Sequence, residues 1–270
     1  MADIENLKKL ANENRKRIID LVYFAKTGHP GGSLSIIDML TAIYELDVDL
    51  TAEKRSKVVL SKGHTVPALY AVLNSKGIIK EEEMKTFRKI NSRLQGHPYT
   101  GTIPEVDATT GLLGQGLSMA VGMAIAKKNT GDNHHVYAIV GDGEMQEGQI
   151  WESLLQAGHY KLNNLILVID YNKLSSFRNV NESINLEPLV DKIRAFNFHT
   201  LEINGNDMEQ VVNALNEAYQ VKDRPIAIIC NTAKGKGISF MENNPKWHNG
   251  QISDKEYKIA LQDLGYAEVQ

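Results

Sequence analysis

Short apolar runs alternate along the chain with longer amphipathic segments. The apolar runs, most of them rich in Val, Ile and Leu as buried strands are, lie at 57–61, 134–140, 165–170, 198–203 and 225–231. Segments with apolar residues at helical spacing lie at 4–26, 34–45, 66–75, 81–89, 117–128, 147–160 and 207–222, and a last short helix follows Ser253. Because strands that alternate with helices build parallel sheets, the pattern predicts an α/β fold. We expect a doubly wound, mostly parallel sheet with helices on both faces, in a single domain of residues 1–270.

Two of the predicted strands end in polar residues that point to a cation site. The run 134–140 leads into Gly141-Asp142-Gly143, and the run 165–170 is followed by Asn172. The carboxyl ends of neighbouring parallel strands share one edge of the sheet, which is where such sheets bind ligands. Carboxylate, amide and backbone carbonyl oxygens suit Mg²⁺, and the absence of Cys and His argues against zinc. Gly-Asp-Gly alone is also common in tight turns, so it is Asn172 that favours the metal site.

Four histidines lie in glycine-rich or strand-end segments. His29 lies in a predicted tight loop, 28–33, whose Ser33 would cap the next helix, and His64 follows a strand. His97 and His248 lie in the tripeptide Gly-His-Pro and the tetrapeptide Trp-His-Asn-Gly, respectively. A histidine in a loop is most often only solvated, so none of these positions indicates function by itself.

Two further segments contain glycines at close intervals. The segment 109–116 predicts a turn before a helix, and most such loops are structural. In 232–237, Lys234 and Lys236 alternate with glycine, which fits a phosphate-binding loop and a solvated turn equally well. The polar stretch 175–185 predicts a mobile loop.

Composition narrows the classes of function. The chain has 270 residues and a formal charge of −3, which gives no reason to expect nucleic-acid or membrane binding. No apolar run has membrane-spanning length, and the N-terminus does not look like a signal peptide. The single Cys230 excludes an internal disulfide and fits a reducing compartment, so we expect a cytoplasmic protein.

The run from Gly141 to Gly148 (GDGEMQEG), with Asn172 about thirty residues later, resembles the thiamine-diphosphate motif of the transketolase family. The resemblance extends from about residue 10 to residue 250 and implies the thiamine-diphosphate-binding fold with Mg²⁺ and thiamine diphosphate as cofactors. It implies metal binding by Asp142, Asn172 and the Leu174 carbonyl, and cofactor contacts from His64, Gly111, Leu112, Leu113, Gly143, Asn172 and His248. It also implies that His29, His97 and His248 surround the sugar as catalytic residues, and that Glu147 links cofactor sites across a subunit interface. Transketolases commonly have Pro where this chain has Leu112.

The resemblance covers only the cofactor's pyrophosphate-binding domain. The pyrimidine-binding and C-terminal domains of the family have no counterpart in these 270 residues. The chain is therefore similar to the N-terminal subunit of a split transketolase, which would need a C-terminal partner subunit to supply the activating glutamate. An α2β2 heterotetramer would follow, transferring two-carbon ketol units between ketose and aldose phosphates in carbohydrate metabolism, as in the pentose phosphate pathway.

Other interpretations share the metal motif. One is a subunit of a different thiamine-dependent enzyme, such as deoxyxylulose-phosphate synthase or the α subunit of a 2-oxoacid dehydrogenase. Another is a non-catalytic cofactor-binding module. The segments Gly-His-Pro-Gly-Gly and Gln-Glu-Gly favour transketolase, and the four histidines argue against a pure binding module.

Overall fold

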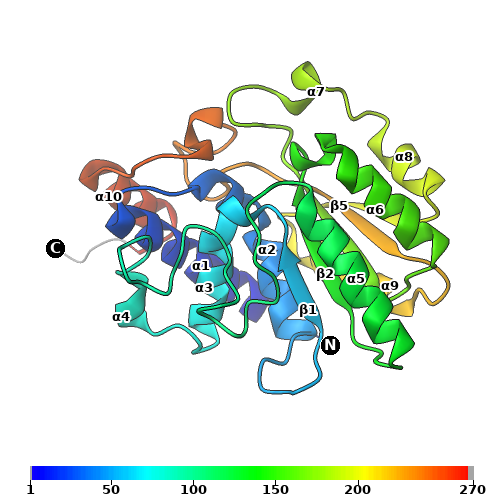
Figure 1. Cartoon of the computed structure of the whole chain (residues 1–270). Coiled ribbons are helices and arrows are strands. Elements are labelled where there is room, and N and C mark those ends of the chain that lie inside the picture. The colour runs from blue at the N-terminus through cyan, green and yellow to red at the C-terminus, as the bar shows by residue number, and fades with distance from the viewer. Residues whose placement is uncertain (1, 267–270) are drawn as a thin grey trace.

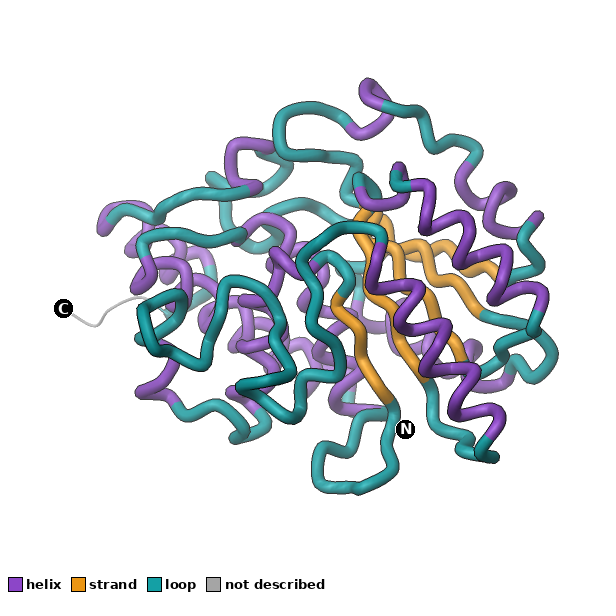
Figure 2. The backbone as a smooth tube through the Cα atoms, in the orientation of Figure 1, coloured by secondary structure: helices purple, strands orange, loops and turns teal. Residues whose placement is uncertain are grey.

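A sheet of five parallel strands forms the framework of the computed structural model, which describes residues 2–266 (Figure 1; Figure 2). The strands are β1 (Lys57–Leu60), β2 (Val136–Gly141), β3 (Leu165–Tyr171), β4 (His199–Asn204) and β5 (Ile226–Asn231), in the spatial order β1-β2-β3-β5-β4. Each lies within two residues of its predicted bounds. Gly141 and Asp170 are register partners, so β2 and β3 end side by side, as predicted.

Helices cover both faces of the sheet, which confirms the doubly wound α/β fold. Side chains of β3 alternate between two cores: Ile166 and Val168 enter one, and Leu167 and Ile169 enter the other. The first core is covered by α1 (Ile4–Ala25), α2 (Pro30–Leu46), α3 (Val66–Ser75), α9 (Met208–Gln220) and α10 (Asp254–Asp263). The second is covered by α5 (Gln115–Asn129), α6 (Gly148–His159) and α8 (Leu189–Ala195).

The strand order explains this division. From β1 to β4 the chain advances across the sheet in one direction, and the helices that lead into β2, β3 and β4 (α5, α6 and α8) share a face. From β4 to β5 it steps back, and α9 lies on the opposite face. Right-handed crossovers require this change of face when the direction reverses. No helix of the described residues is long and apolar enough to span a membrane.

The segment around His29 differs from the prediction. Helix α2 begins at Pro30 rather than at residue 34, with His29 as its N-cap residue. Pro suits the first helical position because it has no N–H to leave unpaired. Ser33 therefore lies within the first turn, where its hydroxyl donates to the His29 carbonyl, and it does not cap the helix as predicted.

Two surface segments also differ. Helix α4 (Glu81–Met84) is shorter than the predicted 81–89, and Arg88 and Asn91 have φ of 60° and 63°, which no α-helix accommodates. The polar stretch predicted as a loop contains the short helix α7 (Val180–Ser183), capped by the Asn179 side chain. Single 3₁₀ turns lie at η1 (Gly63–Thr65), η2 (Glu144–Gln146) and η3 (Pro245–His248).

Candidate active site

A pocket of about 340 Å³ lies where the ends of β1, β2 and β3 meet the start of α2. The strand ends contribute Lys62, Gly141, Asp142 and Asn172, and the start of α2 contributes His29 and Gly32. Its other lining residues are His64, Gly111, Leu113, Gly143, Glu144, Gln146, Leu174, Ser175, Ser176, Lys234 and His248. The structure thus brings together most of the residues selected from the sequence.

Asp142 and Asn172 lie at adjacent strand ends, as the βαβ pattern predicted. One Asp142 carboxylate oxygen accepts from the Gly143 N–H at 2.7 Å, and the other accepts from the Lys173 N–H. The Asn172 amide oxygen accepts from the Leu174 N–H at 3.1 Å, while its Nδ2 donates to Asp170 at 3.1 Å. These backbone bonds fix both side chains at the floor of the pocket.

The electrostatic state of Asp142 fits a cation site. Its side chain is 3% exposed, and burial together with the nearby charge of Asp170 raises its pKa to about 7. A cation beside it would favour the carboxylate. The described residues contain no cluster of three or more His, Cys, Asp and Glu side chains suited to a metal. The donor set is therefore one carboxylate with amide and carbonyl oxygens, which fits Mg²⁺.

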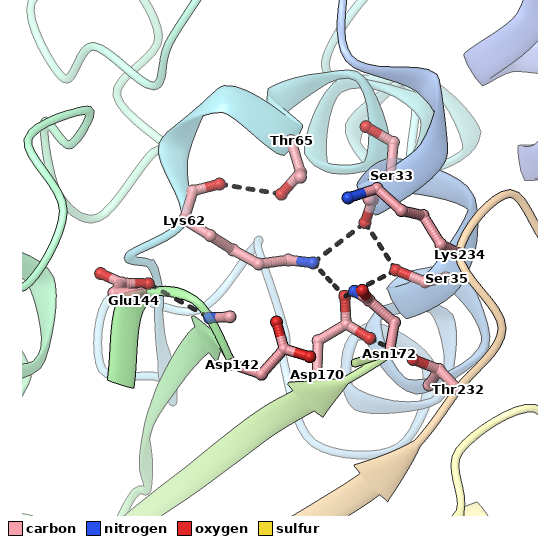
Figure 3. Close-up of polar contacts among 12 residues, drawn as sticks. Ser33, Ser35, Lys62, Thr65, Asp142, Glu144, Asp170, Asn172, Thr232 and Lys234 are labelled. Carbon is pink, nitrogen blue, oxygen red and sulfur yellow. Dashed lines mark hydrogen bonds and ion pairs between the residues drawn. The ribbon is translucent and has the colours of Figure 1, made fainter. Parts of the chain in front are cut away.

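Asp170 forms the polar support beneath this floor (Figure 3). It is fully buried and accepts from the Lys62 ammonium, the hydroxyls of Ser35 and Thr232, and the Asn172 amide. Burial alone would raise the pKa of Asp170, but the charge of Lys62 and the hydrogen bonds from Lys62, Ser35 and Thr232 together hold it below its usual value. Lys62 also donates to the Gly32 carbonyl at 3.0 Å, so one ion pair connects β1, β3 and the start of α2.

Glu144 is a third buried carboxylate at the pocket, and the sequence analysis did not select it as a site residue. It accepts from the Ser61 hydroxyl and from the N–H groups of Gly114 and Gly141, at 2.9 and 3.2 Å. It therefore joins the loop before α5 to the ends of β1 and β2. The signal available was a second carboxylate in the Gly-Asp-Gly-Glu run, which we interpreted only as part of the motif.

Three histidines from distant segments form a triangle over the pocket. The ring centroids of His29, His64 and His248 are 5.1 to 5.5 Å apart. Burial, with the charge of Arg88 added, lowers the pKa of His29 to about 4, and burial with the charge of Lys234 lowers that of His248 to about 3. The pKa of His64 is also well below its usual value, mainly through burial. All three rings are neutral at pH 7, and the buried Nδ1 of His29 has no hydrogen-bond partner in the described structure.

Lys234 is the residue of the 232–237 loop that enters the pocket. Its side chain is 2% exposed, and its ammonium contacts the carbonyls of Leu174 and Ser175 at 2.8 and 3.0 Å and His248 Nδ1 at 3.1 Å. Lys236 lies at the surface beside Glu242. The sequence fitted a phosphate-binding loop and a solvated turn equally well. In the structure, Lys234 lies in the pocket and Lys236 lies in a solvated turn. Lys62 and Lys234 supply the pocket's positive charge, and Gly143 has open space where a side chain would be, so a diphosphate fits beside them.

Three residues selected from the sequence do not line this pocket. Leu112 is 77% exposed, although its neighbours Gly111 and Leu113 are lining residues. His97 lies behind Gly111, with its ring 3.1 Å from where a Cβ of that glycine would be. Glu147 is the exposed N-cap residue of α6. The roles expected for these residues stay predictions.

Comparison with known proteins gives consistent relatives. The protein-family model described as "Transketolase, thiamine diphosphate binding domain" matches residues 6–270. An apulose-4-phosphate transketolase subunit of Phocaeicola vulgatus is 40% identical over 267 residues, covering 97% of this chain and 94% of the relative. The 6-deoxy-6-sulfo-D-fructose transketolase subunit SqwG of a Clostridium species is 39% identical over 264 residues, covering 96% of each chain.

Solved structures agree with the fold. The crystal structure of transketolase from Campylobacter jejuni superposes with a TM-score of 0.92 at 33% identity and covers all of this chain. The match covers 44% of the solved chain, so the present chain spans less than half of its length.

Proposed function

The chain belongs to the transketolase family, and we propose that it is the thiamine-diphosphate-binding subunit of a two-chain transketolase. The enzyme would transfer a two-carbon ketol unit between a ketose phosphate and an aldose phosphate. The observation that supports this best is the buried Asp142 beside Asn172 and the Leu174 carbonyl, with two lysines and three neutral histidines around the same pocket.

The cofactor fits the residues present. Asp142, Asn172 and the Leu174 carbonyl would hold Mg²⁺. His64, Gly143 and the ammonium groups of Lys62 and Lys234 would contact the diphosphate. Gly111 and Leu113 would lie beside the cofactor's rings. When bound, thiamine diphosphate supplies the electron sink for the transferred carbon unit.

The histidines would position the sugar and exchange protons with its hydroxyl groups. His29 and His248 are neutral at pH 7, so each ring has one nitrogen that accepts a proton and one that donates. His97, which lies behind Gly111 and does not line the pocket, would contact the sugar further from the cofactor.

A second chain would complete the site. The names of both relatives denote subunits, and this chain covers nearly their whole length. We infer a partner with a pyrimidine-binding domain whose glutamate activates the cofactor, in an α2β2 assembly in which Glu147 links the two cofactor sites. The relatives' names specify a phosphorylated and a sulfonated sugar, so we propose a sugar with an anionic end group as the substrate. A role in carbohydrate metabolism in the cytoplasm, such as the pentose phosphate pathway, would follow.

Reconstitution tests this proposal. The chain is purified from its own cells with Mg²⁺ and thiamine diphosphate, the second chain is identified by mass spectrometry, and the complex is assayed with ketose phosphates, pyruvate and branched 2-oxoacids. We expect ketol transfer from ketose phosphates by the complex and none by either chain alone. Turnover of pyruvate or 2-oxoacids instead, or full activity of the single chain, would contradict the proposal.

A further inference from the structure

Glu144 lines the cofactor pocket, yet the proposed chemistry gives it no role. It is 2% exposed and follows Gly143 directly, in the 3₁₀ turn η2. Within residues 2–266 its carboxylate forms no ion pair and accepts hydrogen bonds from neutral donors, the Ser61 hydroxyl and the N–H groups of Gly114 and Gly141. Because burial of a carboxylate without a cation is costly, these three bonds need an explanation.

Each of the three donors belongs to the pocket wall or lies next to it. Ser61 precedes Lys62 and Gly114 follows Leu113, while Gly141 is itself a lining residue. One carboxylate therefore connects the end of β1, the end of β2 and the loop before α5.

The two strand ends have other supports. The N–H groups of Ser61 and Lys62 both donate to the Ile139 carbonyl, at 2.9 and 3.3 Å, and the Asp142 N–H donates to the Asp170 carbonyl at 3.2 Å. These bonds extend the parallel ladders of the sheet. The ends of β1 and β2 should therefore keep their positions without Glu144.

The segment 111–113 has no such support. In the described part of the chain its three N–H groups form no hydrogen bond, and Leu112 in the middle is 77% exposed. Before the segment, the Thr110 hydroxyl donates to the carbonyl of the last residue of β1 at 2.7 Å. After the segment, Gly114, with φ of 83°, donates its N–H to Glu144 at 2.9 Å. Glu144 thus fixes one of the two ends of this segment.

We propose that Glu144 is a positioning residue, which holds the segment 111–113 against the rings of the cofactor through the Gly114 N–H. The proposal rests on the proposed function, in which Gly111 and Leu113 lie beside those rings and the lysines contact the diphosphate. A carboxylate suits this purpose because a charged acceptor binds a backbone N–H more strongly than a neutral acceptor does.

The test compares the binding of two ligands, thiamine diphosphate and inorganic pyrophosphate, each with Mg²⁺, to the reconstituted two-chain enzyme. Pyrophosphate has the diphosphate group without the rings. In Glu144→Ala we expect the dissociation constant of thiamine diphosphate to rise about tenfold or more, since a hydrogen bond to a charged group is lost. The dissociation constant of pyrophosphate should stay nearly unchanged. Glu144→Gln keeps an oxygen for the Gly114 N–H and should recover most of the affinity, as isothermal titration would measure.

Amide hydrogen exchange follows the loop itself, without any cofactor. Peptides that cover residues 109–116 should exchange faster in Glu144→Ala than in the wild type, and at about the wild-type rate in Glu144→Gln. Peptides from β1 and β2 should not change, because the sheet holds the strand ends.

Asp47→Ala is the matched control. It also removes a carboxylate that makes two side-chain hydrogen bonds, at the opposite edge of the sheet. It should lower the thermal midpoint without altering either dissociation constant or the exchange of residues 109–116. If Glu144→Ala does not fold, Glu144→Asp provides the same test, because its side chain is shorter by one methylene and cannot keep all three bonds.

Several results would overturn the inference. Equal losses of affinity for thiamine diphosphate and pyrophosphate would show that Glu144 supports the whole pocket. A loss for thiamine diphosphate alone, with unchanged exchange at 109–116, would make Glu144 a direct contact, and unaltered affinity for both ligands would remove any role. If the wild-type enzyme binds thiamine diphosphate no more tightly than pyrophosphate, the proposed function is contradicted instead, while the exchange rates still decide whether Glu144 holds the loop.

Discussion

The polar residues at the two ends of strand β2 differ in whether they have partners within the chain. At its start, His135 and Tyr137 both bind Asp47, at 3.0 and 2.7 Å, and the hydroxyls of Tyr137 and Tyr219 are in hydrogen-bond contact at 3.0 Å. At its end, Asp142 is buried and forms no ion pair among the described residues. The first end is completed by its own chain. The second is left for a ligand.

The histidines show the same difference in pairing. His134, His135 and His199, at the amino ends of β2 and β4, each have a carboxylate within 3.0 Å. Within residues 2–266, His29, His64 and His248 have none, and they lie near lysines. A titratable group that the fold leaves unsatisfied is a candidate for function, whereas a satisfied one is more often structural. Lys62 and Asp170 do not follow this rule, because they form an ion pair with each other although they lie directly beneath the pocket.

Breaking the Lys62–Asp170 ion pair should have the largest effect on stability. Lys62→Met leaves the buried Asp170 without its cation, so we expect the free energy of unfolding to fall by about 3–5 kcal/mol in urea denaturation. The double variant Lys62→Met/Asp170→Asn should recover part of the loss, because the uncompensated charge is gone. If the loss of stability in the double variant equals the sum of the losses in Lys62→Met and Asp170→Asn, the two residues are not coupled. The ion pair would then not support the pocket floor.

Asp142→Ala should abolish cofactor binding without harming the fold. We expect the affinity for thiamine diphosphate with Mg²⁺ to fall by about a hundredfold or more, which is about 2.7 kcal/mol. The free energy of unfolding should change little, because removal of a buried carboxylate is offset by loss of the hydrogen bonds that it accepts from the Gly143 and Lys173 N–H groups. Isothermal titration and urea denaturation measure the two quantities. Unchanged affinity would contradict the assignment of the metal site.

Asp47→Asn tests the other end of β2. Burial alone would raise the pKa of Asp47, but bonds from His135 and Tyr137 hold it below its usual value. We expect a loss of about 1–2 kcal/mol of stability at pH 7 and no change in cofactor affinity. Asp49→Asn, which removes an exposed carboxylate nearby, is the control and should cost less. A cofactor defect in Asp47→Asn would show that the two ends are not independent.

The smallest effect expected is a change in pH dependence. Because the native pKa of His29 is about 4 and that of His248 about 3, the unfolded chain binds more protons than the native chain between about pH 6.5 and 4. Stability should therefore fall as the pH drops through this window. His248→Asn should reduce the slope by at most about 1.4 kcal/mol per pH unit, and by less because the ring is partly exposed. Urea denaturation at pH 7, 6 and 5 measures the slope, and an identical slope in the variant would contradict the low pKa of His248.

Local chemistry made much of the fold predictable. The apolar runs at 136–141 and 165–171 are buried on both faces of the sheet, so they read as continuous strands whatever surrounds them. The prediction was wrong where glycines have a packing role rather than a loop role. In the first turn of α2, a Cβ on Gly31 would be 2.6 Å from the Trp247 carbonyl, a neighbour more than two hundred positions away. No local sequence pattern predicts that contact.

The residues of the candidate site also differ in whether the sequence alone could predict them. Asp142 and Asn172 could be selected from sequence because a βαβ unit brings two strand ends together by short-range rules. The burial of Lys234 and the anchoring role of Glu144 could not, because each depends on segments that meet only after folding. The sequence by itself determined the strands, their polar ends and the family resemblance. Only the tertiary structure decided which charges found partners, because pairing and desolvation depend on distances that the order of residues does not contain.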